Sequence, residues 1–325
     1  MIGSGSSSGE PTELVERWTT ALSRGDVEAT VASGPERPAV SVVVPFLGDR
    51  DGAGRLGAAL AELRLRPGDE LIVADNTATG VARSSLDPGV EVVRAAAERS
   101  SYHARNAGAR RARNEWILFI DADCRPAPGL LDAYFTRPVD EGVGAIAGTI
   151  AAAGRQRTLV ARYVRSRRFF DQSDGLHTHG GGAATANLLL RRSAFEALGG
   201  FVEGIRSAGD VDLTWRLQAA GWKLERRPEA IVRHRHREQL ASLMGAVARY
   251  AAGSRWLNQR YPGASSRWPV RQALVDAARD CVVLALRGNR EEAAFRAIDG
   301  VGLIAHNIGY LSSNAAPRRR LSATG

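Results

Sequence analysis

The sequence contains little cysteine, a single lysine and no long apolar run. Cys124 and Cys281 are the two cysteines among 325 residues, and their separation fits no zinc or redox motif, so neither a disulfide framework nor a cysteine-rich metal site is expected. No stretch of about twenty uninterrupted apolar residues occurs, which disfavours a membrane-spanning helix. No glycine-rich dinucleotide fingerprint or phosphate loop is present, so hydride transfer and P-loop chemistry are disfavoured.

Positive charge dominates the composition. The net charge is +9 and Lys223 is the one lysine, so arginine supplies almost all of the positive charge. Arginine binds phosphate bidentately, and a basic surface suits nucleic acid, an anionic membrane or a nucleotide diphosphate. A bias toward arginine also follows from genome composition, so charge alone leaves the partner open.

The first residues predict no secretion. Met1 to Gly9 is rich in glycine and serine, with no basic residue before an apolar core. We expect a flexible N-terminus with a short helix over 1–38, not a signal peptide. The predicted location is the cytoplasm, with peripheral contact at the inner face of the cell membrane left open.

Short apolar segments alternate with helical patterns in the first 125 residues. Strands are predicted at Val40–Val44, Glu70–Ala74, Val90–Val93 and Trp116–Ile120, and helices at Arg55–Leu63 and Tyr102–Ala112. This order predicts an α/β fold with a mostly parallel, Rossmann-like sheet and helices on both faces. Ligands of such sheets bind at the carboxyl ends of the strands, where Pro45, Asp75 and Asp121 would meet.

The fourth predicted strand ends in two carboxylates, Asp121 and Asp123. Two carboxylates at the rim of a sheet repel each other unless a cation, a sugar hydroxyl or a helix N-terminus compensates them. The pair therefore indicates a metal and phosphate site. An aspartate-rich turn after the strand is the alternative, because aspartate favours turns and caps.

The chain resembles the family 2 inverting glycosyltransferases of the GT-A fold from about residue 39 to residue 236. Seven short segments in this order carry the resemblance: Ser41–Pro45, Ile72–Asp75, Ala104–Gly108, Asp121–Asp123, Ala186–Asn187 before Arg191–Arg192, Gly199–Phe201, and Gly209–Leu213 with Trp215–Arg216. The resemblance implies a metal-dependent transfer of sugar from a nucleotide-diphosphate donor, expected to be a UDP-sugar, to an acceptor hydroxyl.

The resemblance also implies the donor-site residues. The nucleotide would be bound by Pro45, Phe46, Asp75, Arg105 and Asp121, with Asp75 on the base and Asp121 on the ribose. Asp123 would bind the cation, Mn²⁺ or Mg²⁺, since hard cations prefer carboxylate and phosphate oxygens.

A histidine would complete the coordination of the metal. In metal-dependent members of the fold, a histidine in the setting Val-x-His after a strand completes the coordination, so the resemblance implies His234 as the further ligand, with His236 in reserve. A plain surface role in a basic run is the alternative. Arg237 would meet the diphosphate, or belong to a solvated face with its neighbours.

The segment from Ser207 to Leu217 holds the predicted catalytic base, Asp210. In the family this position takes the proton from the acceptor hydroxyl, and a raised pKa would help it to do so. Ser207 and Asp210 also match a helix-capping box, which is the structural alternative, and we assign Asp212 to capping. A glutamate commonly precedes the base in the family, so Gly209 leaves the acceptor side open. Asn187, Gly209 and Trp215 are the predicted contacts to donor sugar or acceptor.

The rest of the chain is less specific. Residues 154–182 combine arginines with apolar residues, as in a basic amphipathic helix that lies on a membrane, shapes the acceptor cleft or packs on the domain. The glycines at 180–182 are compatible with a mobile lid. Beyond a catalytic domain at 39–237, a helical extension is expected over 238–315 and a tail over 316–325.

The extension is also similar, more loosely, to glycosyltransferases of the mycofactocin system, through Arg249–Gly253 and Arg260–Gly263. A lipid, a saccharide, a small metabolite and a peptide all remain candidate acceptors, and a homodimer is left open. The alternatives to an active enzyme are an inactive relative that binds nucleotide-sugar and a basic nucleic-acid-binding protein, whereas the enzyme is expected to bind no nucleic acid.

Overall fold

The computed structural model describes residues 37–154, 156–168, 181–265 and 269–318. The chain divides into two units, Met1–Glu36 and Arg37–Gly325. The predicted N-terminal segment, Gly180 of the predicted lid and most of the predicted tail lie outside the described residues. The further division near residue 238 stays a prediction.

The described residues form an eight-stranded sheet in the order β3-β2-β1-β4-β7-β6-β8-β5. Its strands are β1 Val40–Phe46, β2 Glu70–Asp75, β3 Glu91–Arg94, β4 Trp116–Ile120, β5 Cys124–Pro126, β6 Val143–Ala152, β7 Asn187–Arg191 and β8 Lys223–His234. Strands β1 to β4 pair in parallel, as does β6 with β8, whereas β7 is antiparallel to both β4 and β6, and β5 is antiparallel to β8. The predicted α/β sheet is confirmed, and it is mixed.

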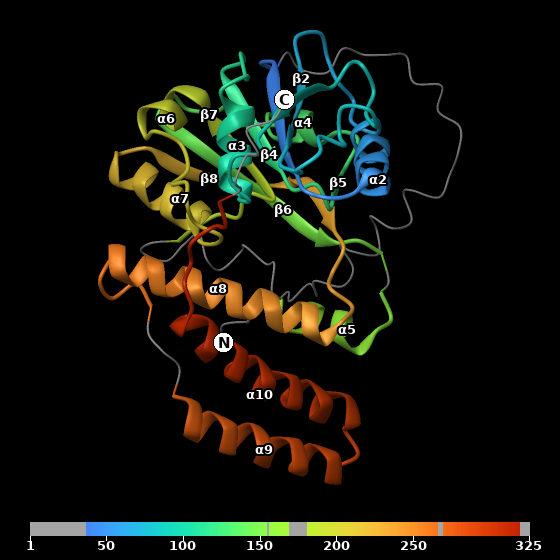
Figure 1. The fold of residues 1–325 in the computed structure, drawn as a ribbon, viewed down its shortest axis with the longest axis vertical. Helices are drawn as coiled ribbons and strands as arrows, with labels where there is room; N and C mark the ends of the chain where they lie inside the picture. Colours follow the sequence, from blue (N-terminus) through green and yellow to red (C-terminus); the bar gives the residue numbers. More distant parts are fainter. Residues whose placement is uncertain (1–36, 155, 169–180, 266–268, 319–325) are drawn as a thin grey trace, which may run out of the picture. The chain divides into compact units, whose positions relative to one another are not determined.

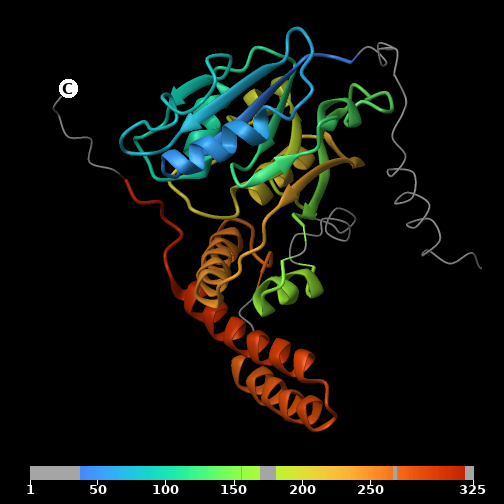
Figure 2. The same ribbon diagram turned by 90° about the vertical axis from the view of Figure 1, so that its right-hand side faces the viewer.

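Helices cover both faces of the parallel half of the sheet, as Figures 1 and 2 show for α2 (Arg50–Leu60) and α3 (Ser101–Ala109). Successive side chains of a strand point to opposite faces. Val42 and Val44 accordingly share a core with Leu56 of α2, while Val43 packs in a second core with Tyr102 of α3. Strand β1 is buried on both sides, which explains its continuous run of β-branched residues.

Further helices follow strand β5 along the chain. They are α4 Leu130–Ala133, α5 Leu159–Ser166, α6 Arg192–Ala197, α7 Gly209–Ala219, α8 Leu240–Arg260, α9 Val270–Leu286 and α10 Arg290–Leu311. Helix α10 packs against both α8 and α9, as Figure 1 shows. The predicted helical extension is therefore present. No helix in the described parts of the chain combines the length and the apolarity that crossing a bilayer requires.

Candidate active site

A cavity of about 400 Å³ lies at the edge where the predicted site residues were expected to meet. Helix α3, the start of α7 and the segments after β4 and at the end of β8 supply residues to its wall: Arg105, Asp121, Asp123, Asp210, His234 and Arg237. These residues come from four separate parts of the sequence, and the fold brings them together. Six of the predicted residues thus line one polar cavity.

Arg105 and Asp121 form the inner part of this cavity. The Arg105 side chain is buried, and its guanidinium donates a hydrogen bond to the Asp121 carboxylate. The guanidinium also lies over the rings of Tyr102 and Phe201, at 5.5 and 5.9 Å from their centroids. Held in this way, Arg105 brings a fixed positive charge to a site that is lined by carboxylates.

Asp123 and His234 approach each other across two paired strands. Strand β5 pairs with the end of β8, with Cys124 opposite His234, so the Asp123 carboxylate lies 3.3 Å from His234 Nε2. Burial raises the pKa of Asp123, but the hydrogen bond and charge of His234, with the charge of Arg237, lower it below its usual range. An ionised carboxylate beside an imidazole offers two ligands to a divalent cation.

The protein supplies only part of a coordination shell there. Within the described ranges, no group of three histidine, cysteine, aspartate or glutamate side chains converges as a metal site. A cation held by Asp123 and His234 would take its other ligands from phosphate oxygens and water, as Mg²⁺ commonly does. The donor set therefore fits a cation that binds together with a diphosphate.

Asp210 lies in the first turn of α7 and faces the same cavity. The Tyr102 hydroxyl lies 3.4 Å from its carboxylate. Burial raises the pKa of Asp210; the charge of Arg105 opposes this and that of Asp121 adds to it, so that the net pKa is raised. A carboxylate with a raised pKa is suited to accept a proton from an attacking hydroxyl.

Tyr102 explains why glycine precedes Asp210. A Cβ atom on Gly209 would lie 2.9 Å from two atoms of the Tyr102 ring, closer than carbon atoms pack. The tyrosine ring thus occupies the space that a larger side chain at position 209 would need.

The predicted capping role of Asp212 is wrong, and the alternative of a capping box formed by Ser207 and Asp210 is not observed. Helix α7 has Ala208 as its N-cap, at φ 71°, and no side chain caps it. Asp212 is fully buried and accepts hydrogen bonds from Arg216 Nε at 2.8 Å and the Tyr261 hydroxyl at 2.8 Å, and Arg260 Nε also lies 2.8 Å from its carboxylate. Since Arg260 and Tyr261 lie at the end of α8, Asp212 ties α7, the helix that carries Asp210, to the extension.

Asp75, Pro45 and Phe46 lie at the carboxyl ends of β1 and β2, as predicted, but outside the lining of the cavity. The buried Asp75 carboxylate accepts hydrogen bonds from the Thr77 amide and hydroxyl at 2.8 and 2.6 Å and from the Ala82 amide at 3.0 Å. It therefore organises its own loop in this structure. Contact of these three residues with a nucleotide stays a prediction.

Asn187 and Trp215 point elsewhere. The Asn187 amide donates to the carbonyls of Thr149 and Ala230 and accepts from the Tyr134 hydroxyl, all within 3.0 Å, so it braces the sheet from a fully buried position. The Trp215 ring packs on Tyr261, with 5.2 Å between the centroids. Neither residue lines the cavity. The reserve ligand His236 is also buried outside it, and burial lowers its pKa.

Sequence reasoning missed several residues of the cavity wall. Tyr102 was predicted only as the start of a helix, whereas Arg249, Tyr250 and Ser254 come from α8. The Arg249 guanidinium lies 5.2 Å from the centroid of the Tyr250 ring. The likeness of Arg249–Gly253 to other glycosyltransferases was the available signal, but it assigned these residues no role.

Comparison with known proteins places one part of the chain in a family. Residues 41–199 match the model of glycosyl transferase family 2. The fold is similar to that of a mannosyltransferase from Pyrobaculum calidifontis, solved in complex with GDP-Man and Mn²⁺, with a TM-score of 0.57, 18% identity, and 93% of this chain and 94% of that chain covered. Residues 41–199 are therefore a family 2 region on a GT-A fold.

Two curated relatives are similar to the chain in sequence. A pre-mycofactocin glycosyltransferase of Mycobacterium tuberculosis is 30% identical over 254 residues, which are 74% of this chain and 53% of that protein. The glycosyltransferase AglE of Haloferax volcanii is 25% identical over 194 residues, 58% of this chain and 64% of that protein. The chain thus spans about half the length of the mycobacterial relative and about two thirds of the archaeal one.

Proposed function

We propose that the protein transfers a sugar from a nucleotide-diphosphate donor, a UDP-sugar, to an acceptor hydroxyl with inversion at the anomeric carbon. The bond between the anomeric carbon and the diphosphate oxygen breaks, and a bond from the acceptor oxygen to that carbon forms on the opposite face. The hydroxyl proton passes to Asp210, and the nucleoside diphosphate leaves. The observation that carries the proposal is the single cavity lined by Asp121, Asp123 and Asp210.

The charged groups of this cavity suit both the departing diphosphate and the attacking acceptor hydroxyl. Arg105 and Arg237 would bind diphosphate oxygens, because guanidinium groups form charge-assisted hydrogen bonds with phosphate. Asp210 would face the acceptor, with its raised pKa bringing its basicity toward that of a general base. One carboxylate acting in a single displacement supports inversion.

Asp123 and His234 would hold the divalent cation, Mn²⁺ or Mg²⁺. Their separation of 3.3 Å and the lowered pKa of Asp123 support this role. When bound, the cation would neutralise charge on the departing diphosphate. Asp121 would contact the ribose while it stays paired with Arg105.

A thermal-shift panel tests the donor site. UDP, GDP, dTDP and CMP are each compared with and without Mn²⁺. We expect UDP to raise the melting temperature in a metal-dependent way, by an amount that grows with ligand concentration as binding to the folded state requires. A larger metal-dependent shift with GDP or dTDP would replace UDP as the donor nucleotide.

The same panel tests the alternatives. If no nucleotide shifts the melting temperature with metal, the donor-site proposal is wrong, and another binding function replaces it. A metal-dependent shift without any sugar transfer would favour the inactive relative that binds nucleotide-sugar. DNA binding that persists near physiological salt and has a slope of several charges would favour the nucleic-acid alternative.

A further inference from the structure

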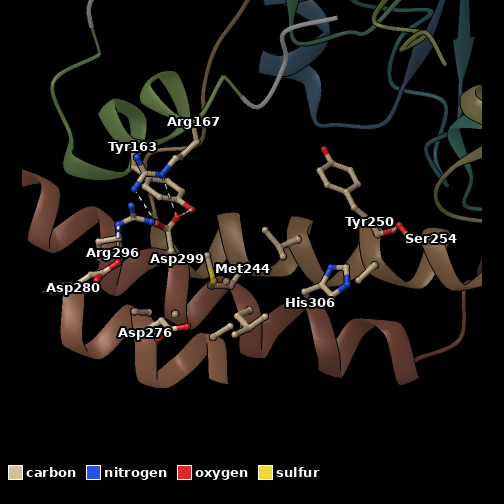
Figure 3. Close-up of a pocket in the computed structure, with 17 residues that line it drawn as sticks. Tyr163, Arg167, Met244, Tyr250, Ser254, Asp276, Asp280, Arg296, Asp299 and His306 are labelled. Atoms are coloured by element: carbon tan, nitrogen blue, oxygen red, sulfur yellow. Dashed lines mark hydrogen bonds and ion pairs between the residues drawn. The ribbon is translucent and has the colours of Figure 1, made fainter. Parts of the chain in front are cut away.

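A second and larger cavity lies among the helices of the extension. Its volume is about 720 Å³, and residues of α5, α8, α9 and α10 line it (Figure 3). None of the residues assigned above to donor binding or proton transfer belongs to its wall.

The wall of this helical cavity is largely apolar. Met244 and Val247 of α8 and Leu303 of α10 contribute aliphatic surface, and Ala273 and Ala277 of α9 leave space between the helices. Pockets of 300 to 1,000 Å³ with mostly apolar walls and a few polar groups are typical sites for small organic ligands. An apolar group about the size of a long alkyl chain or a pair of aromatic rings would fit.

One end of the helical cavity carries charged residues that contact one another. Arg167 donates to Asp299 at 2.8 Å, and the Tyr163 hydroxyl donates to Asp299 at 2.7 Å (Figure 3). Arg167 also donates to Glu292, at 2.8 Å. Arg296 lies 3.5 Å from Asp299.

Two further carboxylates of α9 line the same wall, Asp276 and Asp280. Asp276 accepts a hydrogen bond from the Gln272 amide at 3.1 Å. Acidic groups outnumber arginines in this lining, so a neutral or cationic ligand is favoured over an anion.

The two cavities share part of their walls. Tyr250 and Ser254 of α8 line both the helical cavity and the cavity that contains Asp210. Figure 3 shows the Tyr250 hydroxyl pointing away from α9 and α10. A molecule in the helical cavity that extends past these two residues would therefore enter the cavity of the proposed base.

We propose that the helical cavity binds the apolar body of the acceptor, a neutral or cationic molecule whose hydroxyl group reaches Asp210 past Tyr250 and Ser254. This inference rests on the proposed function, because it presumes that Asp210 activates an acceptor hydroxyl. It identifies the acceptor by chemistry: an amphipathic alcohol, not a polysaccharide or an anionic sugar phosphate.

Matched eight-carbon probes test occupancy and charge preference. The binding of 1-octanol, octylammonium and octanoate to the full chain is measured by calorimetry. We expect octylammonium and 1-octanol to bind at least tenfold more tightly than octanoate. Equal binding of all three, or tightest binding of octanoate, would contradict the proposed charge preference.

Adjacent alanines of α9 locate the binding. Ala277 lines the cavity, whereas Ala278 is exposed, and no residue of this helix is buried. Ala277→Phe should weaken the binding of 1-octanol at least tenfold, while the control Ala278→Phe leaves it unchanged. If both variants bind as the wild type does, the probe sits elsewhere and the proposal is refuted.

A substitution of one lining carboxylate tests the proposed preference for a cationic ligand. Asp276→Asn should reduce the preference for octylammonium over octanoate several-fold without changing the affinity for 1-octanol. Asp51→Asn in α2, which is exposed, is the control. An unchanged preference would show that the carboxylate of Asp276 does not face the ligand.

A turnover measurement tests whether a ligand of the helical cavity is the acceptor in the reaction. With the donor identified by the nucleotide panel, release of nucleoside diphosphate is followed for straight-chain alcohols from butanol to dodecanol. We expect the rate to rise with chain length and Ala277→Phe to reduce it, while metal-dependent nucleotide binding stays unchanged. If the wild type binds nucleotide but no alcohol of any chain length raises the rate of nucleoside diphosphate release, the proposed acceptor site is wrong and the proposed function stands. If the wild type does not bind nucleotide in a metal-dependent way, the proposed function is wrong.

Discussion

The two cavities meet at α8 and differ in almost every physical property. The cavity at the strand ends is polar, with four arginines and three aspartates, whereas the helical cavity is mostly apolar, with two arginines and three aspartates. The first is suited to phosphate and the second to an uncharged or cationic organic body. Under the proposals above, one chain would hold two substrates of opposite character because the sheet and the added helices provide separate surfaces.

Asp210→Asn should have the largest effect and distinguishes the proposed roles of the two cavities. Loss of a general base costs a hundredfold or more in rate, and we expect that reduction in kcat with little change in nucleotide affinity. Because the pKa of Asp210 is raised, the wild-type rate should fall on the acidic side at a higher pH than an ordinary aspartate would cause.

Binding of 1-octanol is the internal control for this variant and should be unchanged. The measurement is steady-state kinetics across pH. An Asp210→Asn enzyme of full activity would refute the assignment of the base.

Asp123→Ala removes one of the two proposed ligands of the cation in the cavity at the strand ends. Loss of a cation ligand should weaken nucleotide binding in the presence of Mn²⁺ on the order of ten- to a hundredfold. Titration calorimetry with and without the metal measures the effect, and Asp51→Asn is the control. Metal-dependent binding equal to that of the wild type would show that Asp123 is not a ligand.

Tyr261→Phe tests the connection between the two regions. It removes a hydrogen bond to the buried Asp212 carboxylate, and such a bond to a charged group contributes about 1.5 to 3 kcal/mol. We expect the free energy of unfolding to fall by about that amount in urea denaturation. Tyr250→Phe, whose residue is 41% exposed, should change stability by less than about 0.5 kcal/mol. Equal stability of the two variants would show that the Tyr261 hydrogen bond does not stabilise the contact between α7 and α8.

The smallest expected effect concerns stability and pH. A raised pKa means that the folded protein binds the Asp210 proton more tightly than the unfolded chain, so ionised Asp210 costs stability above that pKa. Asp210→Asn should therefore melt higher than the wild type at pH 7. The difference should shrink as the pH falls through the raised pKa toward the ordinary value of about 3.9. A lower melting temperature of the variant at pH 7 would contradict this.

The catalytic half of the fold was predictable because its signals are local. Strand β4 was predicted at its observed bounds, and β1 and β2 differ from prediction only at their carboxyl ends. A continuous apolar run followed by a charged residue marks a buried parallel strand and its end, so the convergence of Asp121 and Asp75 on one edge needed no distant contact. The family resemblance then supplied Asp210 and His234.

The remainder depends on contacts between residues far apart in sequence. Asp212 looked like a capping residue because acidic groups favour helix starts, yet its partners Arg260 and Tyr261 lie about fifty residues away. Asn187 matched a family motif, but only the pairing of β7 with its neighbours shows that its amide is used within the sheet. The helical cavity joins α5 to α10, across more than a hundred residues, and no local pattern encodes that contact.

The contact of Gly253 with the loop before α7 has a consequence for engineering. A Cβ atom at this position of α8 would lie 2.9 Å from atoms of Ser207 and Ala208, so the long helix touches the turn that sets the backbone of the base. A chimera that exchanges the extension for that of a relative would therefore change this turn as well. Transplants meant to alter acceptor choice should carry residues 206–209 together with α8 to α10 as one block.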